Sequence, residues 1–281
     1  MSEKTEKRSN IDPEIILQYI SDKIKYGKYQ IAPLSERKRV VITDWNSEEG
    51  TKKLLKAKPN KPFFKLSHNY QSQINPFYCG VACIATILNT LRAKKGLIPN
   101  QKGFDYTKPN GEKVEYRYYN QLNILDENTD KIKQRKDIAP SIKDEKDNHA
   151  EFNPGLSISQ LEEILNYHNV SSEKVIAEKE PEIAIDQFRQ NIKEILQSKR
   201  KFMILNFDGK MCGLSTGGHF STVGAYDDDD DTILILDAAA HKNPWFWVPV
   251  KHIYYAMNTK NDEGYRGYLI VWDEIDDYLS I

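Results

Sequence analysis

The segment that most constrains the fold is a cysteine followed by an apolar run, YQSQINPFYCGVACIATILNTL at residues 70–91. From Ala82 onward, apolar residues recur on one face of a helix, at positions 84, 85, 88 and 91. Pro76, just before the run, is typical of a chain that enters a helix. The pattern predicts a buried helix that begins at Cys79–Gly80, with Cys83 one turn deeper in the core.

Around this helix, the apolar patterns change from helical to extended along the chain. Helices are predicted in SEEGTKKLLKA with Ser47 as N-cap, at 157–167 with Ser157 or Ser159 as cap, and at 181–200. The last third holds short runs rich in β-branched and aromatic residues, which predict strands: KFMILNF, GHFSTVGAYD, TILILDAAA and RGYLIVW. Helices followed by an antiparallel sheet predict an α+β fold.

Three segments of the chain differ in composition from this core. Residues 1–40 are polar and lysine-rich around PEIILQYISDKI, which predicts a short helix on an N-terminal extension. The remaining domain, 41–281, carries a variable insertion near 100–155, which is dense in Lys, Asp, Asn and Gly and predicts a surface loop. The acidic run at 227–231 predicts a solvated hairpin turn, because a calcium loop spaces its carboxylates at alternate positions.

Composition argues against several classes of protein. A net charge of −1 provides no basic field for nucleic acid, and no apolar stretch approaches the roughly 18 residues that span a membrane. No hydrophobic signal opens the chain, so the cytoplasm is the default expectation, and export without such a signal stays open. Three cysteines fit a reducing compartment better than a disulfide scaffold. No zinc spacing is present, although Cys79 and Cys83 together could bind a soft metal.

Cys79, His219 and Asp237 occur in an order that suggests nucleophilic catalysis. Cys79 opens the helix, His219 opens a strand after two glycines, and Asp237 closes the next strand. A histidine about 130–150 residues after the cysteine is the papain-like order. A helix N-terminus and an imidazolium both lower a thiol pKa, so Cys79 would attack as a thiolate. His219 would then protonate the leaving group, while Asp237 holds the imidazole in the required tautomer.

Two neighbouring features fit the same chemistry. Gln73 lies six residues before Cys79, and its side-chain amide could form an oxyanion hole with the Cys79 N–H. Gly217 and Gly218 let the backbone approach a bound substrate. Taken singly, each of these residues has a structural explanation, since a cysteine at the start of an apolar helix is usually a small core residue. Their joint order and spacing favour catalysis.

Three blocks of the chain resemble phytochelatin synthases, the glutathione γ-glutamylcysteinyltransferases. They are YQSQINPFYCGVACIATILN, the stretch GGHFSTVGAYD…TILILDAAAHKNPWFWVPVKHIYYAMN, and SEEG at 47–50. The likeness covers roughly residues 45–93 and 155–273, with Gln73, Cys79, His219 and Asp237 in register. It implies a papain-like fold, in which a helical lobe carries the cysteine and a sheet lobe carries the other two residues. It also implies the short bacterial form, which mainly hydrolyses glutathione.

The resemblance implies a substrate site as well. Cys79 would attack the Cys–Gly carbonyl of glutathione, and the γ-Glu-Cys acyl group would pass to water or to a second glutathione. Residues in register with substrate-binding positions of the family are Arg266 for the γ-glutamyl carboxylate, with Tyr268 beside it, and Asn206. Gly218 is the further candidate substrate-binding residue, because its backbone can approach the substrate. Asp262 is the favoured partner of the γ-glutamyl amine, with Asn261 as the alternative.

Other implications concern metals and partners. No tightly bound cofactor is implied, and cadmium or zinc would enter as a glutathione-thiolate complex, which is part of the substrate. A homodimer stays a hypothesis. The family has an arginine tied to the acceptor side where this chain has Ala240, which argues against efficient transpeptidation.

Two alternatives remain open. A papain-like peptidase acting on another peptide or protein tail would have no need of the Arg266 and Asn206 positions. An inactive homologue that sequesters thiols or metals would have no need of the complete set of Gln73, Cys79, His219 and Asp237.

Overall fold

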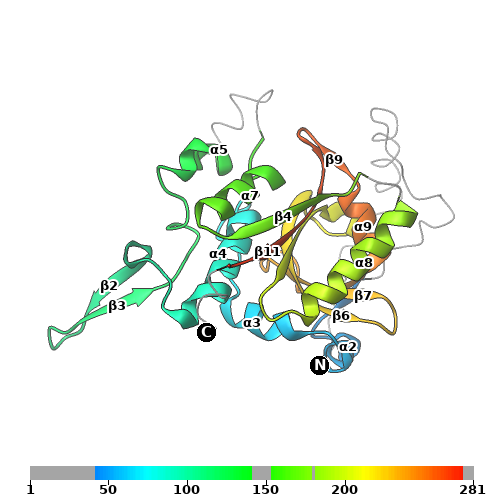
Figure 1. The fold of residues 1–281 in the computed structure, drawn as a ribbon, viewed down its shortest axis with the longest axis horizontal. Coiled ribbons are helices and arrows are strands. Elements are labelled where there is room, and N and C mark those ends of the chain that lie inside the picture. Colours follow the sequence, from blue (N-terminus) through cyan, green and yellow to red (C-terminus); the bar gives the residue numbers. More distant parts are fainter. Residues whose placement is uncertain (1–41, 141–152, 179–180, 275–281) are drawn as a thin grey trace, which may run out of the picture.

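A seven-stranded sheet organises the protein (Figure 1). The computed structural model describes residues 42–140, 153–178 and 181–274, so the helix predicted in PEIILQYISDKI lies outside the described residues. All neighbouring strands of this sheet are antiparallel, in the order β1-β8-β7-β6-β5-β11-β4. The strands are β1 (Thr43–Asp44), β4 (Ser171–Ile176), β5 (Phe202–Asp208), β6 (Gly218–Asp227), β7 (Thr232–Asp237), β8 (Phe246–Pro249) and β11 (Gly267–Trp272).

Helices pack against both faces of this sheet (Figure 1). In β5, Phe202 and Ile204 belong to a core shared with α3, α4 and α7, whereas Met203 and Leu205 pack with α8 and α9. This alternation follows from the two-residue period of a strand. The helices are α2 (Glu48–Lys56), α3 (Lys61–Asn69), α4 (Cys79–Arg92), α7 (Ile158–Tyr167), α8 (Pro181–Gln197) and α9 (Val250–Met257). The α+β prediction is confirmed.

The predicted helix starts at Ser47 and Ser157 are confirmed. The Gly50 N–H donates to Ser47 Oγ at 3.0 Å. Ser157 forms a complete capping box, in which Gln160 N donates to Ser157 Oγ at 3.1 Å and Ser157 N donates to Gln160 Oε1 at 2.9 Å. These caps fix where α2 and α7 begin.

The insertion contains more regular structure than the predicted surface loop. A β-hairpin, β2 (Gly103–Thr107) and β3 (Lys113–Arg117), extends from the body of the protein, and a short helix α5 (Arg135–Ile138) follows (Figure 1). The hairpin alternates aromatic or apolar residues with charged ones: Phe104 and Tyr116 pair on one face, and Asp105 and Glu115 pair on the other. The dense charges of this segment mask the alternation when composition alone is considered.

The acidic run forms the turn between β6 and β7, as predicted, but its carboxylates are paired with cations. Lys53 on α2 forms an ion pair with Asp230. On α8, Arg189 contacts Asp231 at 2.8 Å and Lys193 contacts Asp228 at 2.7 Å. The turn therefore ties two helices to the sheet instead of being only solvated.

None of the helices in the described residues is both long and apolar enough to cross a membrane. The same residues include no group of three or more His, Cys, Asp or Glu side chains placed to hold a metal ion.

Candidate active site

Cys79 is the first residue of α4, as the apolar pattern predicts. No side chain among the described residues caps this helix start, so its first N–H groups remain available to the thiol. Gly80 allows the close approach, because a Cβ there would lie 2.9 Å from Leu161 Cδ1 and 3.3 Å from Phe220 Cδ2. The helix N-terminus is thereby held against α7 and β6.

The Cys79 thiol faces His219 at the start of β6. Burial alone would raise the pKa of this thiol, but a hydrogen bond to His219 and the charge of its imidazolium lower the pKa below the ordinary value. The backbone groups of Phe220 and Gly80 act in the same direction. A thiol with this environment is a thiolate at a lower pH than a free cysteine.

His219 lies between the thiol and a carboxylate. Its Nε2 lies 2.6 Å from Asp237 Oδ1, and both side chains are almost completely buried. Burial disfavours the imidazolium, but hydrogen bonds to Asp237 and Cys79 raise the pKa of His219 to about 10. The three residues can therefore hold a thiolate and an imidazolium together at neutral pH.

Gln73 lies beside the same group. Its backbone N–H donates to the carbonyl of Ala238, the residue after Asp237, at 2.8 Å. Its side-chain Nε2 donates to Asn75 O at 2.8 Å, and its Oε1 is buried without a partner among the described residues. A second Nε2 hydrogen remains available as a donor.

Arg266 and Gly218 are in direct contact. A Cβ on Gly218 would lie 2.9 Å from Arg266 Nη1 and 3.1 Å from Nη2, so the guanidinium lies over the glycine backbone. Arg266 Nε donates to Thr259 Oγ1 at 3.1 Å, which fixes the plane of the fork. This places a buried cation next to the residue that precedes His219.

Asn206 lies on β5, between β6, which carries His219, and β11, which follows Arg266. Within β5 it is paired with Phe220 of β6 on one side and Gly267 of β11 on the other. Its Nδ2 donates to the His219 carbonyl at 3.3 Å, and its Oδ1 is buried without a partner among the described residues. A buried acceptor without a donor is uncommon and requires an explanation.

Tyr268 and Asp262 have no hydrogen bond to this group among the described residues. Tyr268 packs against Phe188 in the core beneath α8, and its hydroxyl accepts from Asn191 Nδ2 at 2.8 Å. Asp262 is exposed in the hairpin formed by β9 (Lys260–Asn261) and β10 (Gly264–Tyr265), where Asn261 Oδ1 accepts from the backbone of Glu263. Sequence register alone did not show these side-chain directions.

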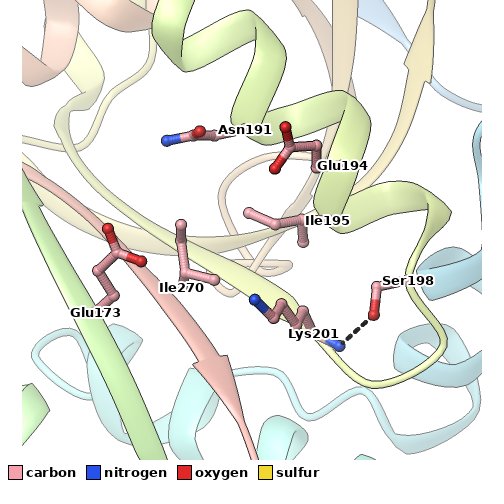
Figure 2. A pocket seen from close by; sticks show the side chains of 7 residues that line it. All are labelled: Glu173, Asn191, Glu194, Ile195, Ser198, Lys201 and Ile270. Atoms are coloured by element: carbon pink, nitrogen blue, oxygen red, sulfur yellow. Dashed lines mark hydrogen bonds between the residues drawn. The ribbon is translucent and has the colours of Figure 1, made fainter.

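A surface pocket lies elsewhere, over the core of α8. Figure 2 shows Asn191 and Glu194 on this helix facing Glu173 and Lys201. Its volume is about 270 Å³, and the described residues that line it include none of the predicted site residues.

Cys83 and Cys212 are both buried and free. Burial raises the pKa of each thiol well above the ordinary value, and the negative charge of Asp237 adds to both shifts. The core role predicted for Cys83 is confirmed by its burial, and Cys212 is fully buried as well.

Three residues of the site were missed by the sequence reasoning. Tyr70 donates from its hydroxyl to the Asp237 carbonyl, Asn243 donates from Nδ2 to Asp237 Oδ2 at 3.1 Å, and Thr259 accepts from Arg266. Each lies in a connection without periodicity, where a polar residue gives no signal of the group it will bind.

Comparison with known proteins adds independent evidence. A family model described as phytochelatin synthase matches residues 36–268. A glutathione gamma-glutamylcysteinyltransferase of Schizosaccharomyces pombe is 28% identical over 212 residues, which are 74% of this chain and 43% of that protein. The Arabidopsis thaliana protein named glutathione gamma-glutamylcysteinyltransferase 1 is 26% identical over 235 residues, 81% of this chain and 41% of that protein.

These relatives are longer than the region of likeness, so this chain spans about two-fifths of their length. The peptidase domain of Streptococcus ComA, a solved structure, aligns with 73% of this chain and 97% of its own at 10% identity, with a TM-score of 0.36, which is too low to support an argument. The family match covers most of the chain and includes Cys79, His219 and Asp237. The protein belongs to the phytochelatin synthase family.

Proposed function

We propose that this protein transfers the γ-Glu-Cys acyl group of glutathione through a thioester on Cys79. The observation that carries the proposal is the buried group of three side chains, in which His219 is hydrogen-bonded to Cys79 and its Nε2 lies 2.6 Å from Asp237 Oδ1. The lowered pKa of the Cys79 thiol agrees with this geometry. Cys79 lies on α4, whereas His219 and Asp237 lie on the sheet. This division supports the papain-like arrangement that we propose for the protein.

The thiolate of Cys79 attacks the carbonyl carbon of the Cys–Gly peptide bond. The bond between this carbon and the glycine nitrogen then breaks, and the His219 imidazolium gives its proton to the leaving amine. In the second half of the reaction, neutral His219 takes a proton from water, whose oxygen attacks the thioester carbon. The bond between this carbon and Cys79 Sγ then breaks, which releases γ-Glu-Cys and returns the thiolate beside the His219 imidazolium. Asp237 holds His219 by Nε2, which leaves the other ring nitrogen for these transfers.

The negative oxygen of the tetrahedral intermediate needs donors. The Cys79 N–H at the start of α4 and the second Nε2 hydrogen of Gln73 supply them. Each donor has its position fixed before substrate arrives, since α4 is buried and the Gln73 backbone is bonded to Ala238.

The γ-glutamyl group explains the neighbouring residues. Its carboxylate requires a cation, and the Arg266 fork over Gly218 can bind two oxygens together. Its ammonium requires an acceptor, and the buried Oδ1 of Asn206 is one. This requirement favours glutathione over a general peptide, which carries no such charged pair at this position. Asp262 and Tyr268 have no role in this assignment.

The acceptor is water or the amine of a second glutathione. A second glutathione yields a product with two γ-Glu-Cys units, which is the start of a phytochelatin. Cadmium or zinc would act as a glutathione-thiolate complex, that is, as part of the substrate.

The test is incubation of the protein with glutathione, with and without cadmium or zinc, followed by mass spectrometry. Free glycine together with γ-Glu-Cys is the expected product of hydrolysis, and (γ-Glu-Cys)₂-Gly is the product of transpeptidation. A matched series replaces glutathione by the ordinary α-linked tripeptide Glu-Cys-Gly, which retains the scissile bond but moves the charged head. Equal turnover of both peptides, or no turnover of glutathione, would overturn the proposal.

A further inference from the structure

We propose that Asn243 is a positioning residue, which holds the Asp237 carboxylate in the orientation that keeps His219 aimed at Cys79. The inference deepens the proposed function and rests on Cys79 as its nucleophile. Asn243 is 8% exposed and lies in the connection between β7 and β8. Its Nδ2 donates to Asp237 Oδ2 at 3.1 Å.

The two oxygens of Asp237 have different partners. Oδ1 receives His219 Nε2 at 2.6 Å and the backbone N–H of Ala239 at 2.7 Å. Among the described residues, Asn243 is the hydrogen-bond donor to Oδ2, and Asp237 has no exposed surface. Without Asn243, a charged oxygen would be buried without this donor, which is costly in a site that excludes water.

The consequence for His219 follows from the geometry of a carboxylate. Donors on both oxygens fix its rotation about the Cβ–Cγ bond, whereas donors on one oxygen alone allow the other to turn toward any available N–H or water. A turned carboxylate weakens the bond between Oδ1 and His219. The imidazole then loses the partner that favours its charged form and its orientation toward Cys79.

Other ionisable groups face Asp237 from the elements around it. Tyr70 precedes α4 and donates to the Asp237 carbonyl. Cys83 on α4 and Cys212 before β6 both experience the charge of Asp237, and burial keeps both thiols neutral. Burial also raises the pKa of Tyr70 to about 12. Between pH 5 and 9, therefore, Tyr70, Cys83 and Cys212 stay uncharged and add no titration of their own.

Two substitutions separate hydrogen bonding from packing. Asn243→Leu keeps the approximate volume and removes the donor at every pH. Asn243→Asp keeps the shape, and the introduced carboxyl can donate only while it is protonated. Two carboxyls at hydrogen-bonding distance share one proton in a pH range where isolated carboxyls are ionised. Asn243→Asp should therefore act like the natural protein at low pH and like Asn243→Leu at high pH.

The readout is the rate at which iodoacetamide alkylates Cys79 between pH 5 and 9, with the modified residue located by mass spectrometry. We expect Asn243→Leu to lower this rate about tenfold near pH 7, the loss typical of one hydrogen bond to a charged group. For Asn243→Asp, the rate relative to the natural protein should decline as pH rises. This assay requires no assumption about the substrate, so it can succeed even if glutathione turnover fails.

Asn89→Leu is the matched control. Asn89 is also buried and bonded, through Nδ2 to Tyr119 O at 2.7 Å, but it lies at the far end of α4. This variant should lose stability and retain the natural pH profile. A natural profile in Asn243→Leu, or equal losses in Asn243→Leu and Asn243→Asp at every pH, would show that Asn243 only packs and would overturn the proposal. If Asn243→Leu fails to fold, the pH dependence of Asn243→Asp alone decides the question.

Discussion

The first and second turns of α4 carry two cysteines whose surroundings shift the thiol pKa in opposite directions. Cys79 and Cys83 lie four residues apart on one helix, and both are buried. The pKa of Cys79 is lowered, whereas burial raises the pKa of Cys83 far above the ordinary value. The extent of burial therefore does not explain the difference between the pKa shifts of the two thiols. Cys79 has His219 and free helix N–H groups as partners, whereas Cys83 faces the core and the negative charges of Cys79 and Asp237.

The largest effect should come from removing the first thiol. Cys79→Ala eliminates the nucleophile, so glycine release from glutathione should fall by about 10⁴-fold or more. Measuring glycine by mass spectrometry tests this, with Cys83→Ala as the matched control. Equal activity of the two variants would contradict the assignment of the nucleophile.

Removing the partner of Cys79 should make the two thiols alike. In His219→Asn, burial remains while the cation is lost, so the pKa of Cys79 should rise above the ordinary value, as that of Cys83 does. Iodoacetamide alkylation at pH 7 should slow by about 10²-fold or more.

The pH profile gives the sign of this effect. In the natural protein, a lowered thiol pKa and an imidazole pKa of about 10 predict a plateau of alkylation through neutral pH. The rate should fall on the acid side as the thiolate gains its proton. In His219→Asn the plateau should be replaced by a rate that climbs only at alkaline pH. An unchanged plateau would mean that helix N–H groups alone activate Cys79.

A third substitution separates thiol reactivity from substrate recognition. Arg266→Leu removes the cation over Gly218, so the KM for glutathione should rise about 10- to 100-fold, while alkylation of Cys79 by a neutral reagent stays unchanged. Steady-state kinetics measure the first quantity. Arg135→Leu, which breaks an exposed ion pair with Asp130, is the control and should leave both quantities unchanged. Slower alkylation in Arg266→Leu would mean that the arginine supports the nucleophile itself.

The smallest effect should follow removal of the second thiol. Cys83→Ala leaves a small void in a well-packed core and should lower the free energy of unfolding by about 1 kcal/mol. Chemical denaturation measures this loss, and glycine release should remain within about twofold. A large loss of activity without loss of stability would give Cys83 a role that its raised pKa does not suggest.

Local patterns predicted the helix at Cys79, the caps at Ser47 and Ser157 and the principal strands, because each depends on nearby residues. The order Cys79, His219, Asp237 could also be recognised from the sequence, since it requires only positions along the chain.

Contacts across the sheet could not be predicted from the sequence. The placement of Arg266 over Gly218 depends on β11 lying next to β5, and no single strand encodes its neighbours.

The directions in which side chains point could not be predicted from the sequence either. Tyr268 follows Arg266 by two residues, yet it lies in the core beneath α8. The strand β11 begins only at Gly267, so Arg266 lies outside the alternation of side chains in that strand. Asn243 was missed because a polar residue in a connecting segment resembles any solvated one until its partner is known.

The position of β11 has a consequence for synthesis. This strand comes after all the other strands of the sheet in the chain, yet it lies between β5 and β4 and is hydrogen-bonded to both. A nascent chain in which β11 has not yet been synthesised already contains Cys79, His219 and Asp237. In that chain, β5 and β4 still lack the strand that lies between them. Arg266 directly precedes β11, so the ribosome adds the guanidinium and the strand that joins β4 to β5 at the same stage. The proposed carboxylate site can therefore form only when this sheet has received its last strand.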